Sequence, residues 1–258
     1  MDEDADATLA LLADLTGATD TKLRDLAREL AGRIVVDISR TGKARSRGVG
    51  KLRSIPMDET GGDLDIDASL EAINLAKASG TAPPLEDLVT RTWTRPGLAL
   101  VLLIDRSGSM NGQRLASAAV ATAAASQRAP EDHAVVAFSD KAVVVKGRTQ
   151  QRDREDVVND VFRLRGFGPT DLALALRVAA DQLADSKAAN KRVILFSDCR
   201  VTAGSDPEDV RDLIDDLHIV APEDDCEDAR AFAESVGAKF AALSGPSGVP
   251  AVFEALLD

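Results

Sequence analysis

Aromatic side chains are scarce in this chain of 258 residues, at 3%, with no tyrosine and a single tryptophan, Trp93. Recognition that stacks bases or sugars on aromatic rings is therefore disfavoured. Basic residues are also outnumbered, 31 against 43 acidic residues, which gives a formal net charge of −12. Because phosphate backbones and anionic membrane surfaces are bound by Lys and Arg, we expect neither a nucleic acid nor a membrane as partner.

Cysteine and long apolar runs are scarce as well. Cys199 and Cys226 are too few and too far apart for a disulfide framework or a CxxC pair. The longest apolar runs, such as residues 98–104, are too short to span a bilayer. The first residues are acidic where a signal peptide would carry positive charge. We expect a soluble protein of the cytoplasm.

Residues 1–97 are predicted to form a small, mostly helical N-terminal region. Leucines at helical spacing over residues 8–32 predict two short helices, and residues 61–67 predict a strand followed by a helix at 68–78 that Asp67 caps. Between them, residues 40–53 carry six basic residues and no acid, interleaved with Gly and Ser. This basic loop is either a solvated loop or a second contact for an acidic partner.

Residues 98–258 show a regular alternation of apolar strands and helices, which predicts one domain. Strands are expected at 98–104, 134–139, 141–146, 192–197, 217–221 and 238–243, with helices in the intervening segments, one of them at 207–216. The turn at Ser139 and Asp140 is so tight that the second and third strands form an antiparallel pair. Helical crossovers make the other pairs parallel. The fold class is therefore α/β, a doubly wound, mostly parallel six-stranded sheet flanked by helices, with one short antiparallel edge strand.

The segment directly after the first of these strands carries the pattern D-x-S-x-S, formed by Asp105, Ser107 and Ser109. One carboxylate and two hydroxyls on alternate residues of a tight loop can face one point. Such an oxygen-only set suits a hard cation, above all Mg²⁺. By itself this short pattern is weak evidence, and its position between a buried strand and a helix strengthens it.

Two further oxygen donors stand at matching positions. Thr170 precedes the helix after Gly168-Pro169, and Asp198 follows the strand at 192–197. Ligands of open α/β sheets bind beyond the carboxyl ends of strands, where strand order reverses. Each residue alone could instead cap a helix or a turn, and Asp171 fits a helix-terminal acid better than a ligand. Their convergence at one edge of the sheet favours a metal site.

The segments DRSGSM, GPTDL and FSDCR resemble the metal-ion-dependent adhesion site of the von Willebrand factor A-type (VWA) domain, and the order of elements over 98–258 resembles its fold. The resemblance implies a metal site of Asp105, Ser107, Ser109, Thr170 and Asp198, in which the hydroxyls are direct ligands and the carboxylates act directly or through water. It implies Mg²⁺, with Mn²⁺ or Ca²⁺ as substitutes. It also implies an open position for an acidic residue of a partner.

The lead-in WTRPGLALVLLIDRSGSM and the segment FSDCRVTAGSDP are similar to those of bacterial intracellular VWA proteins. Such proteins typically work with MoxR-type AAA+ ATPases, and chelatase subunits are related to them. The resemblance therefore implies a MoxR-type ATPase or its client as the partner.

Three functions follow as hypotheses. The first is a non-catalytic, Mg²⁺-dependent protein-binding module, and the second is an accessory subunit of a chelatase or other metal-insertion complex. The third is a hydrolase in which Asp105 and Mg²⁺ activate water. The chain has only two histidines, His133 and His218, both within strands, and no H-x-x-x-H pair or G-x-S-x-G elbow. We therefore expect no enzyme activity.

Overall fold

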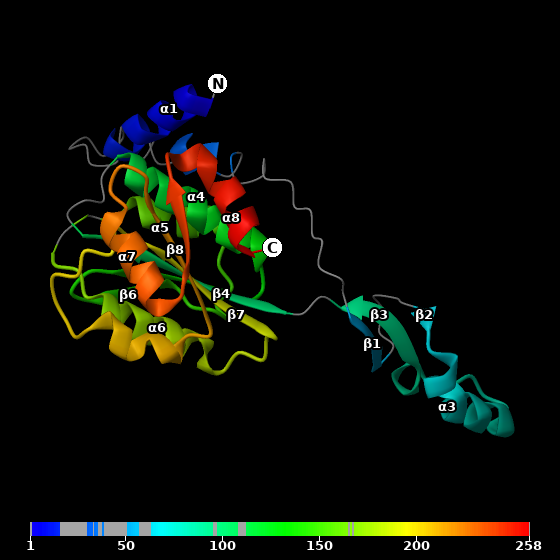
Figure 1. The fold of residues 1–258 in the computed structure, drawn as a ribbon. Coiled ribbons are helices and arrows are strands. Elements are labelled where there is room, and N and C mark those ends of the chain that lie inside the picture. Colours follow the sequence, from blue (N-terminus) through cyan, green and yellow to red (C-terminus); the bar gives the residue numbers. More distant parts are fainter. Residues whose placement is uncertain are drawn as a thin grey trace. The chain divides into compact units, whose positions relative to one another are not determined.

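The computed structural model describes residues 2–15, 30–32, 34–35, 38, 51–56, 63–94, 97–107, 112–164, 166 and 168–257. The chain divides into two compact units, one of Met1–Arg45 with Leu98–Asp258 and one of Ser46–Gly97 (Figure 1). Sequence patterns placed one boundary, between residues 97 and 98. In the structure the first residues group with the C-terminal part, because helix α1 (Asp2–Leu15) contributes Leu9 and Leu12 to its core.

The larger unit contains the six-stranded sheet expected from the sequence. Its strands are β4 (Leu98–Asp105), β5 (His133–Phe138), β6 (Ala142–Lys146), β7 (Asn190–Phe196), β8 (Asp216–Pro222) and β9 (Lys239–Leu243). They lie in the order β6-β5-β4-β7-β8-β9, and every pair is parallel except β5 with β6. The chain leaves β4 toward β5 and β6 and then returns to β7 on the other side of β4. Strand order therefore reverses between β4 and β7.

Helices cover both faces of this sheet (Figure 1). One face is covered by α4 (Gln113–Arg128), α5 (Arg154–Phe162) and α8 (Val249–Leu257), and the other by α6 (Leu172–Ala184), the 3₁₀ helix η2 (Pro207–Leu213) and α7 (Glu227–Val236). The sequence predicted an α-helix over 207–216, where the chain instead forms the shorter η2. The doubly wound α/β fold is confirmed.

Strand β4 explains why an uninterrupted apolar run marks the centre of the domain. Leu100, Leu102 and Ile104 belong to the core beneath α4, whereas Ala99, Val101 and Leu103 belong to the core beneath α6. All six side chains have no exposed surface. A strand buried on both faces needs apolar residues at consecutive positions rather than at alternate ones.

Helix α1 packs on the outer side of α4 (Figure 1). The Asp6 carboxylate accepts hydrogen bonds from the backbone N–H and the hydroxyl of Ser247, both at 2.8 Å, in the 3₁₀ helix η3 (Pro246–Gly248). Of the two helices predicted over 8–32, the first is confirmed. The second was expected to extend to residue 32; residues 30–32 are helical, and residues 16–29 lie outside those the structure describes.

The smaller unit holds a three-stranded sheet, of which the sequence patterns predicted one strand, at 61–67, and missed the other two. Strands β1 (Lys51–Pro56), β2 (Asp63–Leu64) and β3 (Val89–Thr94) form an antiparallel sheet in the order β1-β3-β2. Residues 51–53 of the expected basic loop belong to β1, and residues 40–50 lie outside the described part. Helix α3 (Ile66–Ser79) begins at Asp65, whose carboxylate accepts from the Ala68 N–H at 3.2 Å, so the expected cap at Asp67 is wrong.

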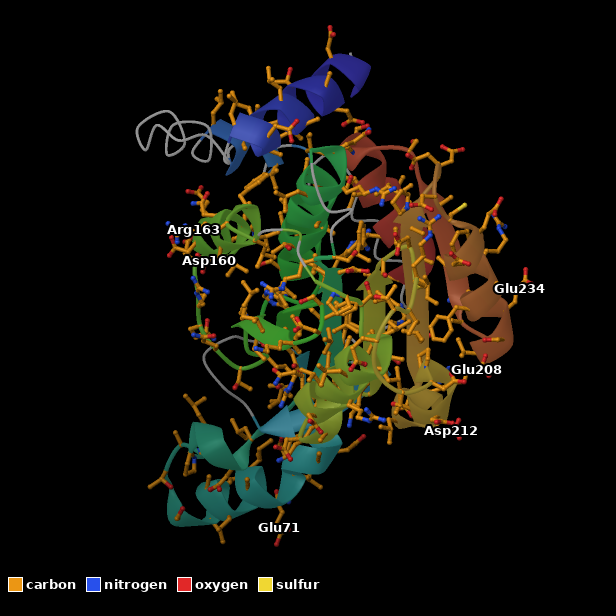
Figure 2. All side chains as sticks on the ribbon, turned by 90° about the vertical axis from the view of Figure 1, so that its left-hand side faces the viewer. Glu71, Asp160, Arg163, Glu208, Asp212 and Glu234 are labelled. Atoms are coloured by element: carbon orange, nitrogen blue, oxygen red, sulfur yellow. The ribbon has the colours of Figure 1, made fainter. Side chains whose placement is uncertain are left out.

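Many charged side chains of the larger unit lie on its outer surface. Glu208 and Asp212 in η2 and Glu234 in α7 point outward, and Asp160 pairs with Arg163 at 2.8 Å on α5 (Figure 2). No helix of the described residues is long and apolar enough to cross a membrane.

Candidate functional site

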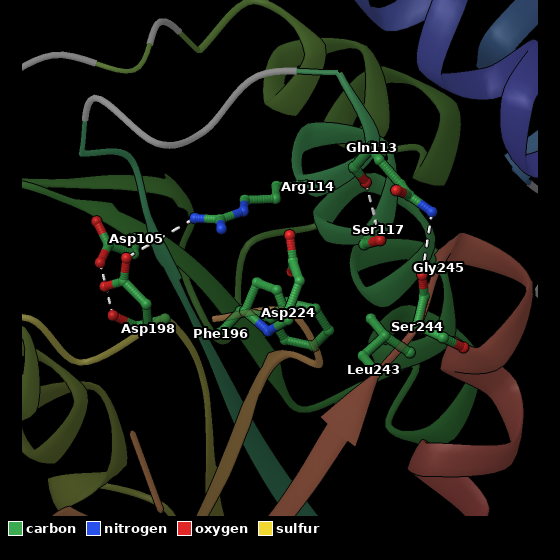
Figure 3. Close-up of a pocket in the computed structure, with 12 residues that line it drawn as sticks. Asp105, Gln113, Arg114, Ser117, Phe196, Asp198, Asp224, Leu243, Ser244 and Gly245 are labelled. Carbon is green, nitrogen blue, oxygen red and sulfur yellow. Dashed lines mark hydrogen bonds and ion pairs between the residues drawn. The ribbon is translucent and has the colours of Figure 1, made fainter. Parts of the chain in front are cut away.

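Two carboxylates lie together where strand order reverses. Asp105 is the last residue of β4, and Asp198 follows β7 by two positions. Because Ile104 and Phe196 are paired in the parallel β4–β7 ladder, the two strands end at the same level. Asp105 is 2% exposed and Asp198 is 7% exposed, and Figure 3 shows the two side chains next to one another. We call this end of the sheet the carboxyl edge.

Hydrogen bonds hold the Asp105 carboxylate in one orientation. The Ser107 N–H donates to Oδ1 at 2.8 Å, and the Ser197 hydroxyl donates to Oδ2 at 2.6 Å. Ser197 Oγ in turn accepts from the Cys199 N–H at 2.9 Å. Sequence analysis missed this role of Ser197, although a hydroxyl at the end of the neighbouring strand was a signal for it.

The environment of Asp105 opposes its charge. Burial raises the pKa of the Asp105 carboxyl, and the nearby Asp198 carboxylate raises this pKa further. The hydrogen bonds from Ser197 and Ser107 act in the opposite direction, because they favour the ionised form. Because both carboxylates are buried and close together, a bound cation would stabilise their ionised forms.

Two basic side chains lie near the two carboxylates. The Arg114 guanidinium, in the first turn of α4, lies 3.7 Å from Asp198 Oδ2 and 3.0 Å from Asp225 Oδ2. Arg200 also pairs with Asp225, at 2.6 Å. The Asp225 carboxylate therefore pairs with two guanidinium groups, and the Arg114 guanidinium contacts two carboxylates. Sequence analysis missed both Arg114 and Asp225.

The turn after β7 has an unusual backbone. Cys199 has a φ of 60°, the only positive φ of a non-glycine residue in the described part of the chain. This conformation lets the Arg200 N–H donate to Asp198 Oδ1 at 3.1 Å. Cys199 is buried, and burial raises the pKa of its thiol, which favours the unreactive form.

Thr170 lies at the same edge of the sheet and is 3% exposed. Its N–H donates to Thr202 Oγ1 at 2.8 Å, and its carbonyl accepts from the Thr202 N–H at 3.1 Å. The next N–H, of Asp171, donates to the Ser139 carbonyl at 2.9 Å, beyond the end of β5. Thr170 and Asp171 are therefore hydrogen-bonded to the loop after β7 and to the residue that follows β5.

Asp171 itself is the N-cap of α6, since its Oδ1 accepts from the Leu174 N–H at 2.9 Å. Gly204 must lack a side chain here, because a Cβ would lie 2.2 Å from Asp171 Oδ1 and its φ is +87°. The expectation of a helix-terminal role for Asp171 is confirmed.

Of the five residues predicted as metal ligands, the structure brings Asp105, Ser107, Thr170 and Asp198 to the carboxyl edge. Ser109 lies in the segment 108–111, outside the described residues. The donors are carboxylate and hydroxyl oxygens, the chemistry that a hard cation such as Mg²⁺ requires. Among the described residues, no group of three or more His, Cys, Asp or Glu side chains is arranged so that these alone could hold a metal ion. The assignment of these five residues as metal ligands stays a prediction.

A cavity of about 250 Å³ adjoins the two carboxylates (Figure 3). It lies between the first turns of α4 and the ends of β7, β8 and β9. Its lining comprises Asp105, Gln113, Arg114, Ser117, Phe196, Ser197, Asp198, Pro222, Asp224, Leu243, Ser244 and Gly245.

Both histidines lie in strands, as expected. His133 Nδ1 lies 2.7 Å from the Ala129 carbonyl, and His218 Nε2 lies 2.8 Å from Asp216 Oδ1. His133 is the first residue of β5, so it lies at the opposite end of the parallel strands from Asp105. His218 is buried within β8. Neither lines the cavity at the carboxyl edge.

Comparison with known proteins identifies the domain. Residues 100–233 match the family model of the von Willebrand factor type A domain. No curated protein matches the chain. A solved structure described as von Willebrand factor type A from Catenulispora acidiphila is 24% identical, with a TM-score of 0.51. The alignment covers 65% of this chain and 43% of that one, so this chain spans less than half of that structure's length.

Two more distant structures share the fold. Proximal thread matrix protein 1 from the mussel byssus is 14% identical, with a TM-score of 0.51, 62% of this chain and 47% of that one being covered. An aerotolerance-related membrane protein from Bacteroides fragilis is 12% identical, with a TM-score of 0.51. Its alignment covers 62% of this chain and 98% of the other. At these identities the likeness shows the fold alone.

Proposed function

Because the chain belongs to the von Willebrand factor type A domain family, a family of protein-interaction modules, we propose that it is a non-catalytic, Mg²⁺-dependent protein-binding module. The observation that carries this proposal is the pair of buried carboxylates, Asp105 and Asp198, at the point where strand order reverses. Neighbouring Ser107 and Thr170 supply hydroxyl groups rather than further charge.

In this proposal Asp105, Ser107, Ser109, Thr170 and Asp198 hold the cation. Bound Mg²⁺ would supply a positive centre with a coordination position for a carboxylate oxygen of the partner. Ser197 holds the Asp105 carboxylate toward the site, and the backbone N–H of Arg200 holds that of Asp198. Neutral hydroxyls leave more positive charge for the incoming acid than additional carboxylates would.

The partner we propose is a MoxR-type AAA+ ATPase or its client, which would place the chain in the bacterial cytoplasm. Support comes from the resemblance of residues 93–110 and 196–207 to bacterial intracellular VWA proteins. The net charge of −12 disfavours an acidic partner surface in general. An acidic partner residue therefore needs a local positive centre, and a dication beside Arg114 and Arg200 provides one.

The test measures stability and partner capture with Mg²⁺ and with EDTA. Magnesium at 100 times its Kd should raise the free energy of unfolding of the wild type by about 2.7 kcal/mol. Asp105→Asn, which keeps the size of the side chain, should show no such increase. The control, Asp212→Asn, changes an exposed acid in η2 and should respond like the wild type.

The same three proteins, used as bait in a lysate of the native host, identify the partner. We expect a MoxR-type ATPase or its client to be captured by the wild type in Mg²⁺, and to be lost with EDTA or Asp105→Asn. Recovery of chelatase subunits instead would favour the metal-insertion alternative. A wild type that melts identically in Mg²⁺ and EDTA would contradict the metal site.

A further inference from the structure

The cavity beside the two carboxylates has an apolar wall. Phe196 at the end of β7 and Leu243 at the end of β9 are 7% and 6% exposed, and both line it (Figure 3). Pro222, at the end of β8, continues the same wall. The volume of the cavity, about 250 Å³, is below the roughly 300–1,000 Å³ of pockets that bind drug-sized ligands. The cavity is therefore matched to one side chain rather than to a nucleotide or another large cofactor.

Most polar groups around this cavity are already bonded within the chain. Gln113 Nε2 donates to the Ser244 carbonyl at 3.0 Å, and the Ser117 hydroxyl donates to the Gln113 carbonyl at 2.9 Å. The positive charge of Arg114 is offset by Asp198 and Asp225. These groups shape the cavity but leave little unpaired charge in it.

Asp224 is the exception. Its side chain is exposed and lines the cavity, and Figure 3 shows its carboxylate pointing into the cavity, between Arg114 and Ser117. It forms no hydrogen bond or ion pair with another described residue, whereas its neighbour Asp225 pairs with Arg114 and Arg200. Apart from the two carboxylates of the candidate metal site, the cavity thus combines an apolar wall with the unpaired negative charge of Asp224.

We propose that this cavity binds a Lys or Arg side chain of the same partner segment whose acidic residue reaches the metal site. The proposal rests on the proposed function, and it adds the chemistry of the second recognition element. The methylene stem of Lys or Arg packs against Phe196 and Leu243, while its cationic group pairs with Asp224. An apolar side chain would leave the Asp224 carboxylate partly desolvated without a partner, and an acidic one would be repelled by it.

The experiment selects peptides on the full chain in Mg²⁺, from a displayed random library with one fixed Glu. The wild type should enrich Lys or Arg at a constant distance from the Glu. Asp224→Asn should abolish that enrichment, and Asp224→Lys should replace it by Asp or Glu at the same position. The matched control is Glu223→Gln, because Glu223 is an exposed acid next in sequence that does not line the cavity.

The selected peptide is then synthesised with Arg or with citrulline, or with Lys or norleucine, at the selected position. For the wild type and Glu223→Gln, loss of the cationic group should weaken binding about tenfold, the change expected for a partly desolvated pair. For Asp224→Asn, both peptides should bind equally. Thermal melting of each variant confirms that the fold is retained.

The outcomes separate the two proposals. If enriched peptides require Mg²⁺ and Asp105 but show no basic preference, the cavity proposal is wrong and the proposed function stands. If a basic preference that depends on Asp224 persists in EDTA and in Asp105→Asn, the cavity proposal stands and the metal site is wrong. A library from which the wild type enriches no sequence overturns both.

Discussion

The two edges of the six-stranded sheet both bury charged side chains, and they treat them differently. At the amino edge, where β5 begins, Lys146 is 3% exposed. Its Nζ donates to the carbonyls of His133, Gly147 and Arg148 at 2.7, 3.2 and 3.5 Å. Nearby, Arg148 pairs with Asp132 at 2.8 Å. The charges of this edge are satisfied by the chain itself.

At the carboxyl edge the balance is different. Asp105 and Asp198 are both buried, Asp105 has no ion pair among the described residues, and the nearest guanidinium lies 3.7 Å from Asp198. Buried charge is costly unless it is paired, so the second edge retains a charge that an external cation can neutralise. A binding site for a cation can therefore be recognised by buried carboxylates that the chain orients with hydrogen bonds but does not fully neutralise with ion pairs.

Removal of the buried Lys146 ammonium group should destabilise the amino edge. Lys146→Met keeps an apolar stem of similar length but leaves three carbonyls without their donor, and each unsatisfied buried group costs about 1–3 kcal/mol. We expect the free energy of unfolding to fall by roughly 4 kcal/mol, with the response to Mg²⁺ unchanged. Urea unfolding measures the loss, and Lys141→Met serves as the control because Lys141 is exposed. A stability loss below that of this control would show that the carbonyl contacts contribute nothing.

The amino edge should also respond to pH, through His133. Burial lowers the pKa of His133 from 6.5 to about 4; Lys146 and Arg154 lower it too, while the hydrogen bond to Ala129 and the charge of Asp132 raise it. As the pH falls, His133 of the unfolded chain therefore becomes protonated near pH 6.5, whereas His133 of the folded chain becomes protonated only near pH 4. The stability that neutral His133 confers is complete above pH 6.5 and is lost as the pH falls toward 4.

The corresponding variant is His133→Asn, whose amide can still donate to the Ala129 carbonyl. Between pH 7 and pH 4 the wild type should lose about 3 kcal/mol of unfolding free energy beyond the loss shown by the variant. Urea unfolding of both proteins at pH 7, 6, 5 and 4 measures this difference. Parallel stability curves would mean that His133 takes up its proton at the same pH in the folded and the unfolded chain, so that burial does not lower its pKa.

The architecture of the larger unit could be predicted from local patterns, because each strand and helix there carries its own signal. The run at 98–104 indicated a strand buried on both faces, and the tight turn at Ser139 and Asp140 indicated the antiparallel pair. In the small sheet only β2 was predicted, as part of a strand at 61–67, and β1 and β3 were missed. Its longer strands, such as β3 with the sequence VTRTWT, mix polar and apolar residues and lack a marked hydrophobic face.

The candidate site could be predicted only in part. Asp105, Ser107, Thr170 and Asp198 were found because strand ends and a short motif identify them. Ser197 and Arg114 were missed because their roles depend on partners 92 and 111 residues away, Asp105 and Asp225. Such pairs are set by which strands and helices become neighbours, and the sequence records at most one side of them, such as the hydroxyl of Ser197 at a strand end.

The carboxyl edge can be tested more finely through Ser197, whose hydroxyl donates to Asp105 Oδ2. In Ser197→Ala the carboxylate loses the donor that orients it, and the Cys199 N–H loses its acceptor. Groups that orient metal ligands typically contribute 10–100-fold to metal affinity. We expect Mg²⁺ to bind about tenfold more weakly, which corresponds to about 1.4 kcal/mol.

Calorimetric titration of Mg²⁺ measures this effect against two matched variants. Ser197→Thr keeps the hydroxyl and should recover most of the affinity. Ser139→Ala removes a fully buried hydroxyl at the end of β5 whose partner is Asp140 rather than Asp105, and it should leave the affinity unchanged. If Ser197→Ala binds Mg²⁺ as tightly as the wild type, orientation of Asp105 does not contribute to binding. The carboxyl edge would then differ from the amino edge only in that Asp105 lacks an ion pair among the described residues, and the hydrogen bond that orients its carboxylate would have no role in binding the ion.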